Sequence, residues 1–216
     1  MKNIVLYAPP AAGKGTQCEL LVQEHGYEVI SIGQVLRNAR NPETEIGRII
    51  IETQDNGILT PDDIVAKALQ EELLKYENSS IVVEGYPRNI DQAKLLDTIL
   101  DNYIVINLDV DREIAKKRTL GRVTCSKCHK IYNIYFPDMN SQKEGICDMC
   151  GSELESRTDD NEQSFNVRFD IYESNAPAIL DYYTAKGILY KVDSSISKEH
   201  TSSQVEKILS EGIVND

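Results

Sequence analysis

Apolar residues in this chain gather in short runs that alternate with longer stretches in which they recur every three or four positions. Short runs between turn-forming residues are typical of buried strands, whereas the recurring spacing is typical of helices that pack by one face. The runs predict five strands, at residues 4–7, 28–30, 81–83, 103–108 and 188–192. The recurring spacing predicts helices at about residues 17–25, 33–37, 43–54, 60–76, 90–100, 112–120, 162–186 and 201–210.

One predicted helix has a distinctive start, the sequence TPDD at residues 60–63. The proline has a backbone angle that suits the first turn, and the two aspartates lie at the positive end of the helix dipole. The hydroxyl of Thr60 can accept a hydrogen bond from a first-turn amide. We therefore expect Thr60 to cap this helix.

Strands that alternate with helices indicate a five-stranded parallel sheet with helices on both faces. The amphipathic pattern stops near Arg122, and cysteines, aromatics and polar residues replace it until about Arg157. We predict an α/β fold with a core of residues 1–121 and 159–216, and an inserted subdomain at 122–158. A chain of 216 residues, 41% of them hydrophobic, is long enough for one such domain.

The charge of the chain argues against one class of partner. It carries 35 acidic and 23 basic side chains, a formal net charge of −12. A nucleic-acid-binding surface needs clustered lysine and arginine, so we expect no nucleic acid partner.

The apolar run at residues 3–7 is too short for a signal peptide, and no stretch approaches the ~20 apolar residues of a membrane span. We expect a cytoplasmic protein with no membrane partner.

A glycine-containing loop joins the first predicted strand to the first predicted helix. It reads APPAAGKGT over residues 8–16, a partial match to G-x-x-x-x-G-K-[ST], because Ala8 replaces the first glycine and Gly15 precedes Thr16. In such loops, backbone N–H groups and the helix N-terminus face phosphate oxygens, and the lysine adds a positive charge. An ordinary turn with a solvated lysine is the alternative, but the strand-loop-helix context favours phosphate binding.

Four of the five cysteines form two C-x-x-C pairs, 18 residues apart. In a chain without an export signal, this spacing indicates a zinc ribbon rather than disulfides. Ligation by four thiolates leaves no open position, so the zinc would be structural and would supply the folding energy of an insertion poor in apolar residues. The predicted ligands are Cys125, Cys128, Cys147 and Cys150.

Two other interpretations of the cysteines agree less well with the sequence. Residues 125–129 match C-x-x-C-H, the attachment motif of c-type haem, but haem attachment needs export and leaves the second pair unexplained. A nucleic-acid-binding ribbon would need a basic stripe, whereas residues 122–158 hold five basic and five acidic side chains. The fifth cysteine, Cys18, is expected to be buried on the first helix. No partner is evident for His25 or for the other two histidines.

Further motifs follow the loop. They are SIGQVLR at 31–37, EGYPRN at 84–89 with Gln92, Arg118 with GR at 121–122, and RTDDNE at 157–162 with Arg168. With the loop, they resemble the adenylate kinases, a family of P-loop nucleoside monophosphate kinases, and the cysteine insertion resembles the lid of the zinc-containing, long-lid bacterial type. The resemblance implies reversible transfer, ATP + AMP = 2 ADP, by a monomer that uses Mg²⁺ with ATP and a structural Zn²⁺.

The resemblance also implies roles for the matching positions. The ATP site would consist of Ala11, Ala12, Gly13, Lys14, Gly15, Thr16, Arg118, Arg122, Ile131 and Tyr132. The AMP site, with a helical segment at about residues 31–60, would consist of Ile32, Arg37, Ile58, Leu59, Thr60, Gly85, Arg88, Gln92, Arg157 and Arg168. The catalytic residues would be Lys14, Arg88, Arg122, Arg157 and Arg168. Glu84 would orient water bound to Mg²⁺.

Arginines suit this chemistry for a physical reason. In transfer between nucleotides the attacking group is already an anionic phosphate oxygen, so catalysis reduces to alignment and to neutralising charge. Planar, permanently charged guanidinium groups do this better than flexible ammonium groups. A surface ion pair is the simpler explanation of a single arginine, but Arg88 follows the C-terminal end of a predicted strand, where parallel sheets bind ligands.

The chain departs from the family pattern at several positions. Ala8 and Ala11 stand where glycine is usual, Ile32 replaces threonine, and Glu84 replaces aspartate. A Cβ at a position of positive φ costs about 1 kcal/mol, so we expect an active enzyme that is slower than a typical member. One alternative is a kinase that prefers another base, but Gln92 argues for adenine. The other is a nucleotide-binding homologue with impaired catalysis, but the retained lysine and arginines argue against it.

Overall fold

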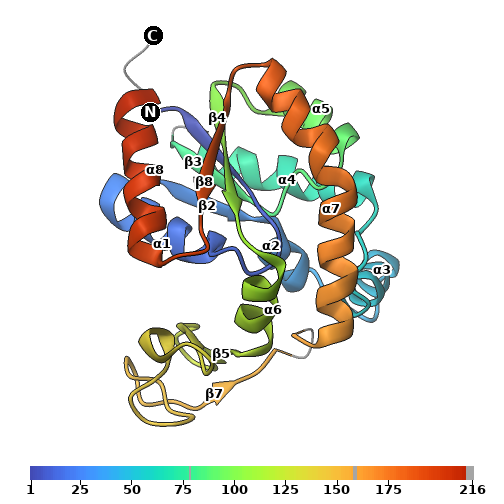
Figure 1. Cartoon of the computed structure of the whole chain (residues 1–216). Helices are drawn as coiled ribbons and strands as arrows, with labels where there is room; N and C mark the ends of the chain where they lie inside the picture. Colours follow the sequence, from blue (N-terminus) through green and yellow to red (C-terminus); the bar gives the residue numbers. More distant parts are fainter. Residues whose placement is uncertain (78, 158–159, 213–216) are drawn as a thin grey trace.

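The protein is built around one parallel sheet. In the computed structural model, which describes residues 1–77, 79–157 and 160–212, five strands lie between two layers of helices (Figure 1). The strands run in the order β2–β3–β1–β4–β8. They are β1 (Asn3–Tyr7), β2 (Glu28–Ser31), β3 (Ile81–Glu84), β4 (Tyr103–Asp109) and β8 (Leu189–Asp193). The predicted α/β fold with a five-stranded parallel sheet is confirmed.

The helix starts lie within two residues of the predicted ones, except that the first and last helices each start three residues earlier. The helices are α1 (Lys14–His25), α2 (Ile32–Asn38), α3 (Glu45–Asp55), α4 (Asp62–Leu73), α5 (Ile90–Ile99), α6 (Arg112–Leu120), α7 (Glu162–Ala185) and α8 (Lys198–Gly212), with 3-10 turns η1 (Leu74–Tyr76) and η2 (Pro137–Met139). The first turns of α1 and α8 face a cavity rather than the core, which is why they lack amphipathic spacing. Of the described helices, none is both long and apolar enough to cross a membrane.

The central strand divides the core between the two faces of the sheet. Val5 and Tyr7 pack with residues of α2, α3, α4, α5 and the second half of α7. Ile4 and Leu6 point the other way and pack with α1, α6, α8 and the start of α7. This alternation, with all four side chains buried, is the period-two pattern of a strand covered on both faces. Cys18 is buried in the second cluster, as predicted.

The start of α4 differs from the prediction. The helix begins at Asp62, with Pro61 at the N-cap position, and Asp62 and Asp63 form its acidic first turn. Thr60 lies one residue too early to cap the helix. Its hydroxyl instead shares a hydrogen bond of 3.0 Å with the hydroxyl of Thr53, in the buried contact between α3 and the chain entering α4. The prediction that Thr60 caps α4 is therefore wrong.

A second, smaller sheet follows α6 and precedes α7 in the chain, and it lies below α6 in Figure 1. It consists of the antiparallel strands β5 (Arg122–Cys125), β6 (Ile131–Asn133) and β7 (Leu154–Glu155), in the order β6–β5–β7. Gly121 joins it to α6, and a Cβ there would lie 2.3 Å from Oδ1 of Asn133. Glycine thus allows β6 to pack directly on the junction. The predicted boundary at 158/159, with Thr158 and Asp159 of the RTDDNE motif, lies outside the described residues.

Candidate functional site

A cavity of about 370 Å³ opens where β1 and β3 end. Parallel sheets bind ligands at this edge, next to the loops that leave the strands, and the volume suits a small molecule. Most of the residues singled out in the sequence line it. They are Ala11, Ala12, Gly13, Lys14, Gly15, Thr16, Arg37, Leu59, Glu84, Gly85, Arg88, Arg118, Arg122, Ile131, Tyr132, Arg157 and Arg168.

Four predicted site residues lie elsewhere. Ile58 and Thr60 line a neighbouring cavity, which shares Arg88 and other arginines with the first. Ile32 and Gln92 line neither of these cavities, and they are 1% and 2% exposed. The family resemblance could not show that Ile32 and Gln92 are buried, because their burial depends on how α2 and α5 pack against the sheet.

Gln92 supports the loop that carries Arg88. Its Oε1 accepts a hydrogen bond from the backbone N–H of Arg88 at 2.7 Å, and its Nε2 donates to Oδ1 of Asp62 at 2.6 Å. The side chain of Asn89 caps α5 by accepting from the N–H of Gln92, and its Nδ2 donates to both oxygens of Asp62. The first turns of α4 and α5 are thus joined beside the cavity.

The loop after β1 has the geometry of an anion cradle. Gly13 has a φ of 91°, and α1 starts directly after it with no side-chain cap among the described residues. The first N–H groups of α1 therefore remain available at the positive end of the helix. Nζ of Lys14 donates to the carbonyls of Pro9 at 2.8 Å and Ala8 at 3.2 Å, which folds the side chain back along the loop.

Burial lowers the pKa of Lys14 to about 8, and the positive charges of Arg88 and Arg122 add to the effect, while Glu84 opposes it. The charged form of Lys14 is disfavoured because Glu84 only partly offsets the burial and the positive charge of the two arginines. A phosphate group bound in the loop would supply the missing negative charge.

We predict that ATP binding near pH 8 takes up protons. Bound phosphates would raise the lowered pKa of Lys14 again, so the affinity for ATP should fall as the pH rises through about 8. Calorimetry in buffers of different protonation enthalpy measures the uptake. Lys14→Gln should abolish it, and wild-type binding without proton uptake between pH 7 and 9 would contradict the assignment.

The two alanines of the loop differ in conformation. Ala11 has a φ of 56°, in the left-handed region, so it occupies a position that favours glycine, whereas Ala8 does not have a positive φ. The strain at Ala11 costs about 1 kcal/mol, and the chain accommodates it without losing the cradle. The expectation that both alanines replace glycines of special conformation holds only for Ala11.

Opposite effects on stability are therefore expected for two glycine substitutions. Ala11→Gly should raise the free energy of unfolding by about 0.5–1 kcal/mol, because the relief of strain exceeds the added entropy of the unfolded chain. Ala8→Gly, which relieves no strain, should lower it by a similar amount. Denaturant unfolding of both variants measures the difference. Equal destabilisation by the two would show that Ala11 is not strained.

Several cavity arginines have a hydrogen-bond partner that orients the guanidinium group. Nε of Arg88 donates to the carbonyl of Gly85 at 3.0 Å. Arg122 donates two hydrogen bonds, of 2.6 and 2.5 Å, to the buried carboxylate of Asp160. Such bidentate geometry fixes the plane of the guanidinium. The basic side chains that line the cavity outnumber its carboxylates, which favours an anionic ligand.

Arg168 is oriented by a residue of its own helix and by close packing. Its Nε and Nη2 donate to Oγ of Ser164, at 3.1 and 2.7 Å. Gly57, with a φ of 70°, lies against both, since a Cβ there would lie 3.0 Å from that Oγ and 3.3 Å from Cγ of Arg168. Glu84 also lines the cavity, and its carboxylate accepts a hydrogen bond of 2.6 Å from the hydroxyl of Ser31. Its carboxylate is the type of ligand that Mg²⁺ and its waters prefer.

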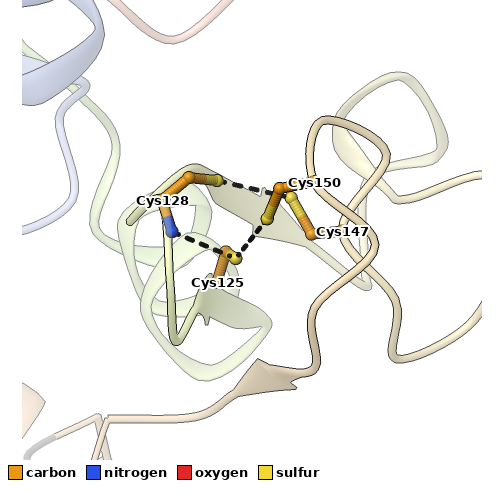
Figure 2. Close-up of side chains that lie close together, drawn as sticks. All are labelled: Cys125, Cys128, Cys147 and Cys150. Atoms are coloured by element: carbon orange, nitrogen blue, oxygen red, sulfur yellow. Dashed lines mark hydrogen bonds between the residues drawn. The ribbon is translucent and has the colours of Figure 1, made fainter.

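The four paired cysteines come together at one end of the small sheet, Cys125 from β5 and the other three from the adjoining loops (Figure 2). Their sulfur atoms all lie within 4.8 Å of one another, with 3.4 Å between Cys125 and Cys150 and 3.5 Å between Cys128 and Cys147. These separations are far beyond the ~2.05 Å of a disulfide. They are close to the roughly 3.8 Å edge of a tetrahedron built from Zn–S bonds of ~2.3 Å. The donor set fits structural zinc.

Hydrogen bonds prepare the cluster for a cation. The N–H groups of Lys127 and Cys128 both lie 3.4 Å from Sγ of Cys125. The hydroxyl of Tyr132 accepts from the N–H of Asp148 and contacts Sγ of Cys147 at 3.5 Å, and this contact is the main cause that lowers the pKa of Cys147 to about 6. Bonds of this kind favour the thiolate that zinc binds. His129 is exposed beside the cluster.

The sequence did not single out one part of the cavity wall. Ser194, Ser197, Lys198 and Thr201, at the end of β8 and the start of α8, also line the cavity. Arg118 donates to the carbonyl of Ser194 at 2.9 Å and so joins this segment to α6. The position of the segment at the carboxyl end of a sheet strand was the signal that could have found it.

Comparisons with known proteins agree with this geometry. The sequence model of the adenylate kinase family matches residues 6–188. The chain is 36% identical to the adenylate kinase of Caldanaerobacter subterraneus subsp. tengcongensis over 213 residues, which covers 96% of each protein. It is 37% identical over 214 residues to that of Archaeoglobus fulgidus, covering 96% of this chain and 97% of the relative. This chain therefore belongs to the adenylate kinase family.

Proposed function

We propose that the protein is a cytoplasmic, monomeric adenylate kinase that catalyses ATP + AMP = 2 ADP. The observation that carries the proposal is one cavity that gathers the phosphate loop, its lysine and the arginines of several elements. In-line transfer between two nucleotides needs positive charge around both the donor and the acceptor phosphates, which this arrangement provides. The reaction needs no general base. Membership of the family supports the same reaction.

The ATP phosphates would lie on the loop at residues 11–16. The amides at the start of α1 would bind phosphate oxygens, and the side chain of Lys14 would leave its two loop carbonyls to reach them. Arg118 and Arg122 line the same cavity and would lie over the nucleotide, with Ile131 and Tyr132 near its base. Mg²⁺ would enter with ATP and neutralise the phosphates, and Glu84 would orient its bound water.

The AMP phosphate would be held by Arg37, Arg88, Arg157 and Arg168, all of which line both cavities. The helical segment at about residues 31–60 would hold the rest of AMP, with Gly85 beside it, and Ile58, Leu59 and Thr60 near the base. Gln92 is buried and lines neither cavity, so it would act on AMP by holding the backbone of Arg88 in place.

Residues 122–158 would form a lid held together by structural zinc. The small sheet lies between α6 and α7, so movement at these two connections would carry Arg122 and Tyr132 over ATP. A closed lid excludes water and prevents loss of the phosphoryl group by hydrolysis. Zn²⁺ would be bound by the four cysteines and would take no part in the reaction.

Two features weaken the alternatives. Ile32, the residue that suggests another base preference, is buried and lines neither cavity. Ala11, the residue that suggests impaired catalysis, adopts the positive φ that the loop needs. The test is ADP formation from MgATP with AMP, CMP, UMP and GMP offered separately. Turnover with AMP at least about tenfold above the others supports the proposal, and an equal or better pyrimidine or guanine acceptor overturns it.

Ser164 offers a prediction about the position of Arg168. Ser164→Ala removes the oxygen that accepts two guanidinium hydrogen bonds, so we expect kcat to fall roughly tenfold or more with a smaller change in KM for ATP. Ser164→Thr keeps the oxygen and should retain more of the activity than the alanine variant. Steady-state kinetics of both test this. A lower melting temperature with unchanged kcat would show that Ser164 is only structural.

A further inference from the structure

A second group of metal-ligating side chains lies away from the cavity. Glu24 and His25 end α1, and Glu206 belongs to the neighbouring helix α8 (Figure 1). One imidazole nitrogen and one carboxylate oxygen from each glutamate all lie within 4.8 Å of one another. Nε2 of His25 lies 2.7 Å from Oε1 of Glu206, so this histidine has a partner that the sequence did not reveal.

The histidine is held in place by its surroundings. Its ring meets the ring of Tyr27 edge-on, with 6.5 Å between centroids, and Tyr27 is itself buried and bonded to the carbonyl of Lys2. The two helices are joined further along by a hydrogen bond of 3.2 Å from Gln17 to Ser202. The three ligating side chains thus project from a fixed pair of helices, which reduces the ordering needed to bind an ion.

The local charge favours a cation. The carbonyls at the C-terminal end of α1 provide the negative end of a helix dipole, and two carboxylates lie beside it. Among the described residues, no ion pair joins Glu24 or Glu206 to a lysine or arginine. The side chains of His25 and Glu206 are 26% and 43% exposed, so an ion can reach them from solvent.

We propose that Glu24, His25 and Glu206 form a second metal site, for a divalent transition-metal ion. An imidazole with two carboxylates suits Zn²⁺, Ni²⁺ or Co²⁺ better than Mg²⁺ or Ca²⁺, which prefer oxygen ligands alone. Water completes the coordination because three protein ligands leave positions open. The ion links the C-terminal end of α1 to the middle of α8.

The site is tested on nucleotide-free protein whose four lid cysteines already hold zinc. Calorimetric titration with Zn²⁺ should reveal one further equivalent, and added Zn²⁺ should raise the melting temperature. His25→Gln and Glu206→Gln should each weaken this binding at least ~10-fold and remove the rise in melting temperature. Glu199→Gln removes the same negative charge as Glu206→Gln, but from an exposed residue of α8. It should change neither the binding of Zn²⁺ nor the rise in melting temperature.

The alternative is that His25 and Glu206 form an ion pair only. Titration without a further equivalent, or with an equivalent that survives both substitutions, would overturn the proposal. Kinase activity is not a readout, so the result does not depend on the proposed reaction. Both substituted residues are partly exposed, and an unchanged melting temperature in the absence of metal would confirm that the variants are folded.

Discussion

Replacing Lys14 with methionine is expected to lower turnover by roughly 10³-fold while the fold stays intact. In the proposed reaction the lysine is the mobile cation of the phosphate loop, and a charged donor aimed at developing charge in a closed site contributes an effect of this size. Methionine preserves much of the length and none of the charge. The measurement is steady-state ADP formation by the variant and the wild type.

The fold should tolerate this substitution for a reason visible in the free protein. Burial lowers the pKa of Lys14, so the charged form is disfavoured there and its removal costs little stability. The melting temperature of Lys14→Met should therefore equal or exceed that of the wild type. Lys94→Met, on the exposed face of α5, is the matched control and should change neither property. Turnover within tenfold of wild type in Lys14→Met would refute the phosphate-loop assignment.

The second large effect is expected from removal of zinc. The buried apolar cluster of the small sheet consists of Cys125, Tyr132 and Cys147, with Val123 and Leu154 packed against it. Two of its three buried members are proposed zinc ligands, so without zinc the sheet would have almost no core. Cys128→Ser, or chelation of the metal, should unfold residues 122–155 and leave the main sheet folded.

Hydrogen exchange distinguishes this from global unfolding. Protection of the amides of β5, β6 and β7 should fall by at least ~10³-fold in the zinc-free protein, while β1 and β4 remain protected. Zinc content and the melting temperature of the lid should fall together. Ser126→Ala, an exposed neighbour between the two ligands, should have no such effect. Full protection of the sheet in zinc-free protein would show that the metal does not hold it together.

The fold could be predicted from the sequence because the strands of a sheet covered on both faces are nearly continuous apolar runs. Ile4 to Tyr7 is such a run, and its residues divide between the two clusters of the core. The start of α4 could not be predicted, because Thr60 had two potential partners. In the folded protein the hydroxyl of Thr60 bonds to the buried hydroxyl of Thr53 instead of to a helix amide.

Only those parts of the site that belong to contiguous sequence motifs could be predicted. The loop, the EGYPRN segment and the paired cysteines form contiguous patterns, and the structure brings them into the cavity or the metal cluster. Ile32 and Gln92 belong to similar motifs, yet packing buries them beside the cavity. Ser194 and Lys198 belong to a polar stretch with no pattern, and only the place of β8 in the sheet brings them to the cavity.

In the proposed reaction one cavity passes a phosphoryl group directly from ATP to AMP. The most direct measurement supplies ATP labelled with ³²P at the γ-phosphate, together with Mg²⁺ and AMP, and follows the label. We predict that it appears in the β-phosphate of ADP formed from AMP, with little free phosphate. Label released only as inorganic phosphate, or retained in ATP despite measurable binding of both nucleotides, would contradict the account.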